Sequence, residues 1–114
     1  MTVERMTVLS AGIRRSGRLS REIRIILSGA DAAGRQFSEA TTTLMLSPHG
    51  ASVISHQKLI PEQEVFLRVV STNREIELRV CGEIGERKDG YIYGVAFVDP
   101  ELDFWQTEFP AADG

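Results

Sequence analysis

Apolar and polar residues alternate in several short stretches of this chain. In residues 23–27, Ile23, Ile25 and Leu27 fall on one side of an extended backbone, which predicts a strand with one buried face. The same alternation, or an enrichment in β-branched and aromatic residues, predicts further strands over residues 37–46, 51–55, 65–70, 76–80 and 91–98. About six short strands joined by tight turns favour an all-β fold, either an antiparallel sandwich or a closed barrel.

Clusters of turn-forming residues connect the predicted strands. The polar residues 71–74 predict a turn, and therefore a hairpin of residues 65–70 with residues 76–80. A second polar turn is predicted over residues 85–90. Gly94 lies inside the last predicted strand, where a glycine indicates a bulge or a close approach of another backbone.

The end of the chain combines a helix-start signal with aromatic residues. Asp99 as N-cap and Pro100 at the first helical position predict a short helix or turn over residues 102–109, which Pro110 ends. This stretch carries three aromatic side chains, Phe104, Trp105 and Phe109. We expect them to close one end of the barrel, and a patch for docking a partner is the alternative.

The length of 114 residues predicts one domain. We place it at residues 13–110, after an N-terminal leader at 1–12 and before a tail at 111–114. The only cysteine, Cys81, excludes an internal disulfide and a multi-cysteine zinc site, and we expect it to be a packing thiol. Without an apolar run of membrane-spanning length or a secretory signal, we expect a cytoplasmic protein that does not insert into membranes.

Positive charge is concentrated near the N-terminus of a chain whose net charge is −3. Five arginines fall within eleven residues with only Glu22 opposing them, and this arginine cluster consists of Arg14, Arg15, Arg18, Arg21 and Arg24. A solvated basic loop is the simplest explanation of such a run. The alternative is anion recognition, since a guanidinium can hold a phosphate bidentately, grip the edge of a guanine or stack on a purine.

A second motif, Ser47-Pro48-His49-Gly50, interrupts the predicted strands about thirty residues later. Pro48 cannot donate to a strand ladder and Gly50 permits a positive φ, so a turn is predicted. Ser47 offers a hydroxyl, and Gly50 would let a ligand approach the backbone closely. The alternative is a structural bulge or turn. His49 is most simply interpreted as an exposed turn residue, and a contact with a ligand is the more specific alternative.

Together, the two motifs resemble those of PilZ domains, small β-barrels that bind cyclic di-GMP. Arg14 and Arg18 match the RxxxR motif, with Arg15 as an extra contact, and Ser47 and Gly50 match the end of the [D/N]xSxxG motif. The resemblance covers about residues 14–110. It implies that the arginine loop wraps over the barrel and clamps the dinucleotide, while the second motif meets a guanine from the barrel side.

Met45 departs from that pattern, because the family has Asp or Asn at this position. A thioether is a weak acceptor at best, so the loss of one hydrogen bond is expected to cost about 1–3 kcal/mol. That corresponds to roughly a ten- to hundredfold loss of affinity. The predicted ligand site comprises Arg14, Arg15, Arg18, Ser47 and Gly50, extended by Met45 and His49.

The resemblance implies a cyclic di-GMP receptor that passes its signal to an unidentified protein partner. We expect no catalysis, cofactor, metal or nucleic-acid polymer, since the sequence offers no nucleophile with a base, paired acid or ligand cluster. A degenerate PilZ domain that binds no nucleotide and serves as a protein-interaction module is the main alternative. Binding of single-stranded nucleic acid ranks last, because aromatic residues and arginines are far apart in sequence.

Overall fold

The computed structural model describes residues 17–101 and 103–109, and these residues form seven β-strands and no helix. The strands are β3 (Leu19–Ser20), β4 (Arg24–Ala30), β5 (Gln36–Ser47), β6 (Gly50–Ser55), β7 (Glu64–Val69), β8 (Glu75–Arg87) and β9 (Gly90–Phe97). The predicted leader at 1–12 and the predicted tail at 111–114 lie outside the described residues. The all-β prediction is confirmed.

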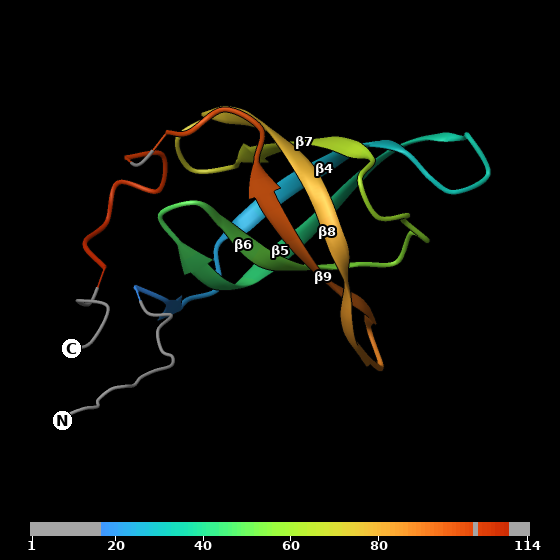
Figure 1. The fold of residues 1–114 in the computed structure, drawn as a ribbon, viewed down its shortest axis with the longest axis horizontal. Helices are drawn as coiled ribbons and strands as arrows, with labels where there is room; N and C mark the ends of the chain where they lie inside the picture. The colour runs from blue at the N-terminus through green and yellow to red at the C-terminus, as the bar shows by residue number, and fades with distance from the viewer. Residues whose placement is uncertain (1–16, 102, 110–114) are drawn as a thin grey trace, which may run out of the picture.

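Six of the strands close into an antiparallel barrel (Figure 1). They follow the order β5-β4-β7-β8-β9-β6, and β6 pairs again with β5. The short β3 is an additional strand on β5, where Leu19 pairs with Leu46 and Ser20 with Met45. Closure gives each long strand a neighbour on both sides, so the sheet has no long open edge. The expectation of a small barrel of about six strands is therefore confirmed.

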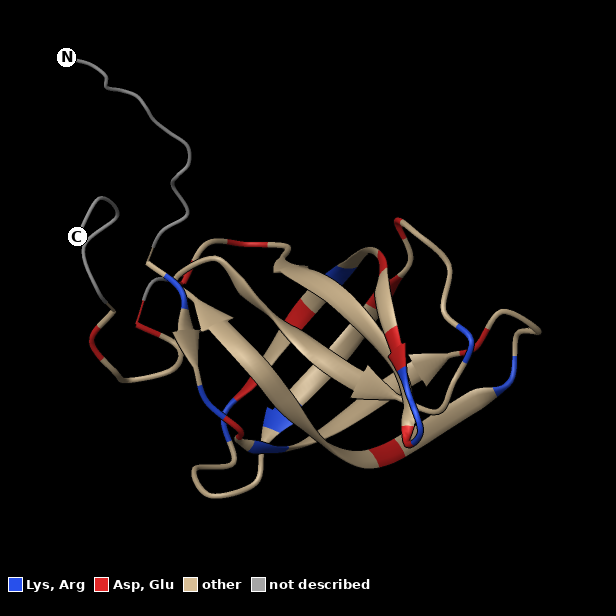
Figure 2. Cartoon of the chain, turned by 90° about the horizontal axis from the view of Figure 1, so that it is seen from below, with Lys and Arg blue, Asp and Glu red and all other residues tan. Residues whose placement is uncertain are grey.

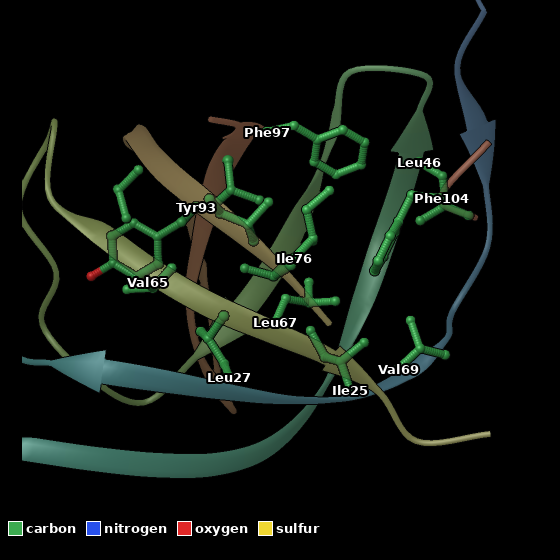
Figure 3. Packing of buried hydrophobic residues seen from close by; sticks show 14 of the residues in the cluster. Ile25, Leu27, Leu46, Val65, Leu67, Val69, Ile76, Tyr93, Phe97 and Phe104 are labelled. Atoms are coloured by element: carbon green, nitrogen blue, oxygen red, sulfur yellow. The ribbon is translucent and has the colours of Figure 1, made fainter. Parts of the chain in front are cut away.

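Apolar side chains from all six barrel strands fill the interior (Figure 3). The predicted alternation of β4 is confirmed, because Ile25 and Leu27 are fully buried. Tyr93 on β9 is the largest fully buried side chain of the described residues. Its hydroxyl donates to the Gln57 carbonyl oxygen at 3.0 Å and accepts from the Leu59 N–H at 3.0 Å. Both hydrogen-bonding capacities are satisfied inside the core, and burial raises the pKa of Tyr93.

Strand β8 is much longer than predicted and contains two irregularities. It runs to Arg87, so the predicted turn over 85–90 shrinks to the two residues between Arg87 and Gly90. The pairing with β9 slips once between Val80 and Gly82 and once between Glu83 and Gly85. Each slip inserts one extra residue into β8, which is a β-bulge.

These bulges correct two predictions about single residues. Gly94 shows neither the bulge nor the close backbone approach that were expected there. It pairs with Ser52 and Gly82, the bulge lies on the facing strand, and an added Cβ would meet only the Ile84 side chain, at 3.9 Å. Cys81 is the extra residue of the first bulge and is exposed, so the expectation of a packing thiol was wrong. Because Ile76, Leu78 and Val80 are buried, the alternation along β8 already turns Cys81 to the outer face with Glu77 and Arg79, so packing was the wrong expectation for this position.

The C-terminal segment, of which residues 99–101 and 103–109 are described, packs against the barrel as turns. The expected short helix is not formed by its described residues, whereas the alternative of a turn agrees with two i to i+3 hydrogen bonds. Phe104 donates its N–H to Glu101, and Gln106, with φ of 56°, donates to Asp103. Phe104 and Trp105 are buried against the core, which confirms that these aromatic side chains pack against the barrel. Within the described residues, no helix has the length and apolar character needed to cross a membrane.

Candidate functional site

A cleft of about 240 Å³ opens on the outside of the barrel, next to β3 and the β5–β6 turn. Its described lining residues come from four strands and from the residue before β3, and they are Arg18, Met45, Leu46, Ser47, Ala51, Ser52, Ile84 and Gly94. Arg18 is the only charged side chain among them. Three residues of the predicted ligand site, Arg18, Met45 and Ser47, therefore lie at one cleft.

The cleft exists because a row of outward-facing positions carries small residues. Met45 on β5 pairs with Ser52 on β6, Ser52 pairs with Gly94 on β9, and Gly94 pairs with Gly82 on β8. Adjacent positions in register point to the same face of a sheet. Gly94 and Gly82 have no side chain, and the Ser52 hydroxyl already accepts the Met45 N–H at 3.2 Å. Of this row, Met45, Ser52 and Gly94 line the cleft, so Gly94 leaves bare backbone in its floor and longer side chains stand around it.

The pairing of β3 with β5 brings Arg18 to the cleft. Leu19 lies opposite Leu46, so the preceding residue, Arg18, comes level with Ser47. The buried Thr43 holds the chain that follows, since its hydroxyl donates to the Arg21 carbonyl oxygen at 2.8 Å and accepts from the Ile23 N–H at 2.9 Å. Arg18 itself is exposed and lines the cleft, where a guanidinium can bind an anionic ligand.

The second motif forms a tight hairpin turn between β5 and β6. Ser47 pairs with Gly50, and Pro48 and His49 form the two-residue connection. The Ser47 hydroxyl accepts the His49 N–H at 3.3 Å, which is the local backbone bond expected of a structural turn. Ser47 also lines the cleft, so the structural and ligand-facing interpretations of this residue are compatible. His49 is exposed and is not among the residues lining the cleft.

Gly50 is needed for a reason other than the predicted one. It has no positive φ, and it is buried beside β9. An added Cβ would overlap the Val95 carbonyl oxygen and would come within 3.0 Å of the Ala96 Cα. Gly50 does not line the cleft either, so its role in the structure is to let β6 and β9 approach each other.

Two of the predicted site residues, Arg14 and Arg15, lie outside the described residues. Five lining residues were not predicted as part of the site: Leu46, Ala51, Ser52, Ile84 and Gly94. The glycine in a predicted strand was a usable signal for Gly94. Ile84 lay between a predicted strand and a predicted turn, and only the bulge in β8 brings it to the cleft.

Charges of both signs are interspersed along the strands and loops of the barrel (Figure 2). Arg18 is therefore a local positive charge at the cleft, on a chain whose net charge is −3. Among residues 17–101 and 103–109, no group of three or more His, Cys, Asp or Glu side chains could hold a metal ion. The described cleft offers one guanidinium, serine hydroxyl groups and apolar walls.

In comparisons with known proteins, no family model matches the chain, and no curated protein matches it. The resemblance to PilZ domains therefore rests on the two sequence motifs. The barrel fold is compatible with that resemblance, but proteins with many different functions share such a fold.

Proposed function

We propose that this protein is a cyclic di-GMP-binding receptor that signals through a protein partner. The observation that carries the proposal is the meeting of two motifs at one cleft. Arg18 from the arginine cluster and Ser47 from the turn are about thirty residues apart in sequence, yet both line it. The pairing of β3 with β5 brings the two motifs side by side, and the cleft gives both of them a shared surface that a ligand could occupy.

The chemistry of the lining residues suits a guanine nucleotide. The Arg18 guanidinium can hold a phosphate or the O6/N7 edge of guanine with two parallel hydrogen bonds. Ser47 offers a hydroxyl from the opposite motif, and Arg14 and Arg15 would supply further cationic contacts from the chain before Arg18. No catalytic step is part of this proposal. Ordering of the arginine loop on the ligand would change the surface that a protein partner meets.

Met45 supports an alternative function of a different class. It lines the cleft at the position where an Asp or Asn would be expected to hydrogen-bond the ligand. A barrel that has lost this contact could serve as an interaction module without a nucleotide. The two proposals differ in one measurable property, which is the affinity of the purified protein for cyclic di-GMP.

Isothermal titration of the full chain with cyclic di-GMP tests the proposal. We expect saturable binding in the micromolar range or tighter, which Arg18→Ala and Arg14→Ala each weaken about tenfold or more, because each removes a charge-assisted contact. Arg35→Ala is the matched control, since Arg35 is an exposed arginine in the β4–β5 connection. Absence of binding heat at high protein concentration would refute the receptor and favour the interaction module.

Two further variants test the cleft itself. Met45→Asn is expected to tighten binding roughly ten- to hundredfold by restoring a hydrogen bond. Gly94→Val is expected to abolish binding by filling the floor. A Cβ at Gly94 meets no atom nearer than 3.9 Å, so this variant should fold. Unchanged affinity in a folded Gly94→Val protein would place the ligand elsewhere.

A further inference from the structure

Ile84 is a large apolar side chain in an unfavourable place. It is 66% exposed, more than the other large hydrophobic residues of the described chain, Ile60, Phe66 and Val70. A single exposed isoleucine is common on protein surfaces, so the position of Ile84 is more informative than its exposure. Unlike those three residues, Ile84 lines the cleft.

The second bulge of β8 explains this position. Glu83 pairs with Tyr93 and Gly85 with Ile92, so Ile84 is the inserted residue without a pairing partner on β9. A bulge changes the direction of a side chain relative to the regular pleat. A Cβ placed on Gly94 would lie 3.9 Å from the Ile84 Cγ2 atom, so the isoleucine stands directly beside the bare floor. The bulge thus builds an apolar wall over a surface kept free of side chains.

The groups lining the cleft suit a ligand that has both a flat apolar part and a polar edge. Met45, Leu46 and Ile84 are its large apolar side chains, and Arg18 supplies its charge. The Ser52 hydroxyl already accepts a hydrogen bond from the Met45 backbone. A ring with a polarizable face can contact the methionine sulfur and the isoleucine methyl groups while its edge reaches the arginine.

We propose that Ile84 contacts the face of a heteroaromatic ring and holds it over Gly94. This inference rests on the proposed function, since the ring would be a guanine of cyclic di-GMP. It also gives Met45 a positive role: the residue provides an apolar contact to the ring where an Asp or Asn would provide a hydrogen bond. Ile84 would then be a determinant of ligand affinity that neither motif contains.

Titration of single-residue variants gives the first test. Ile84→Ala is expected to bind cyclic di-GMP about tenfold more weakly, the effect of losing contact for roughly two CH₂ groups. Ile84→Val should lose less affinity than Ile84→Ala. Ile60→Ala is the matched control, because Ile60 is 51% exposed but does not line the cleft. The thermal midpoint of each variant shows whether folding is preserved. Equal affinities of Ile84→Ala and the wild type would overturn the inference while leaving the receptor function intact.

Methyl NMR gives a direct test of ring contact. The Ile84 methyl signals, assigned by their loss in Ile84→Leu, should shift upfield when cyclic di-GMP places an aromatic face against them. Ribose 5-phosphate, which has a phosphate and no base, should leave these signals unshifted. Neither cyclic di-GMP nor ribose 5-phosphate should shift the Ile60 methyl signals. Binding with no upfield shift at Ile84 would overturn the ring contact alone. A wild-type protein that binds no cyclic di-GMP would overturn both this inference and the proposed function.

Discussion

Gly50 fits into the barrel wall only because it has no side chain. The strand β9 passes so close that an added Cβ would overlap the Val95 carbonyl oxygen. Backbone groups in a paired strand cannot move aside as a flexible side chain can. The restriction is therefore steric and belongs to the barrel, whatever the cleft binds.

We expect Gly50→Ala to lower the free energy of unfolding by about 1–3 kcal/mol, the usual cost of overpacking. Urea denaturation followed by circular dichroism measures the change. Gly82→Ala is the control, because a Cβ at Gly82 would meet no atom within 4 Å. Equal stabilities of the two variants would contradict the steric explanation.

Two carboxyl groups on neighbouring strands also respond to each other. The side-chain hydrogen bond with Glu64 is the main cause that raises the pKa of Glu77, and partial burial and the negative charges of Glu64 and Asp99 add to it. A raised carboxyl pKa means that the folded state binds the proton more tightly than the unfolded state. The stabilisation is therefore complete at low pH and is lost as the pH rises through the raised pKa.

Glu77→Gln is consequently expected to raise the thermal midpoint at pH 7, because it removes a carboxyl group whose raised pKa disfavours the folded state once the proton is lost. The gain should disappear near pH 3, where Glu77 carries its proton in both the folded and the unfolded state. Thermal unfolding across this pH range measures the difference. Glu75→Gln removes the same charge from the same strand and should not give this pH-dependent gain. A gain for Glu77→Gln that is constant with pH would refute the explanation.

At the scale of elements, the C-terminal segment is tied to the turn that borders the cleft. The Trp105 indole N–H is shared between the carbonyl oxygens of Ser47, at 3.1 Å, and Gly50, at 3.2 Å. The indole also packs on Phe104 and Phe97, with ring centroids 5.0 and 6.0 Å away. The Trp105 side chain, which belongs to the C-terminal segment, thus binds both ends of the hairpin turn.

Trp105→Phe keeps an aromatic ring in this cluster and removes the donor. We expect the free energy of unfolding to fall by about 1–3 kcal/mol, because both carbonyl groups lose their shared partner and the smaller ring leaves space. Urea denaturation by circular dichroism is the measurement. Tyr91→Phe, which removes a polar group from an aromatic side chain away from this turn, should change stability little. If Trp105→Phe were as stable as the wild type, the indole bond would not be holding the turn.

The sequence predicted regular elements well and irregular ones poorly. Alternation identified strands such as β4, because a buried face imposes a period of two wherever pairing is regular. Alternation did not predict the full length of β8, which runs on to Arg87 through bulges at Cys81 and Ile84 that break the period of two. For the site, residue chemistry singled out Arg18 and Ser47, whereas Gly94 and Ile84 depend on cross-strand register, which local sequence does not specify.

At the scale of the whole molecule, closure of the barrel depends on a seam between β5 and β6. Backbone pairing of these strands ends at Thr43 and Val53, and side chains continue the seam beyond that point. Thr41 donates its hydroxyl to the Ile54 carbonyl oxygen at 2.7 Å. The Glu39 carboxylate, 10% exposed, accepts from the Ser55 hydroxyl at 2.7 Å and from the His56 N–H at 2.8 Å. Polar side chains therefore connect the two sides of the seam beyond the point where the backbone hydrogen bonds between β5 and β6 end.

Glu39→Ala tests whether this seam stabilises the barrel as a unit. The variant leaves the fully buried Ser55 hydroxyl without its acceptor, at an expected cost of about 1–3 kcal/mol. If the barrel opens only as a whole, that loss should accelerate exchange of slow amides roughly ten- to hundredfold on strands far from the seam. Hydrogen exchange at Leu67 and Val80, on β7 and β8, measures this directly.

The matched control is Glu86→Ala, an exposed glutamate on the β8–β9 hairpin, which should leave the exchange rates of the core unchanged. Faster exchange confined to Ile54 and Ser55 would show that the seam frays locally without limiting global stability. Acceleration by one common factor in β7 and β8 would show the opposite. Since both strands reach the seam only through their neighbours, a common factor requires that the ring of strands opens cooperatively.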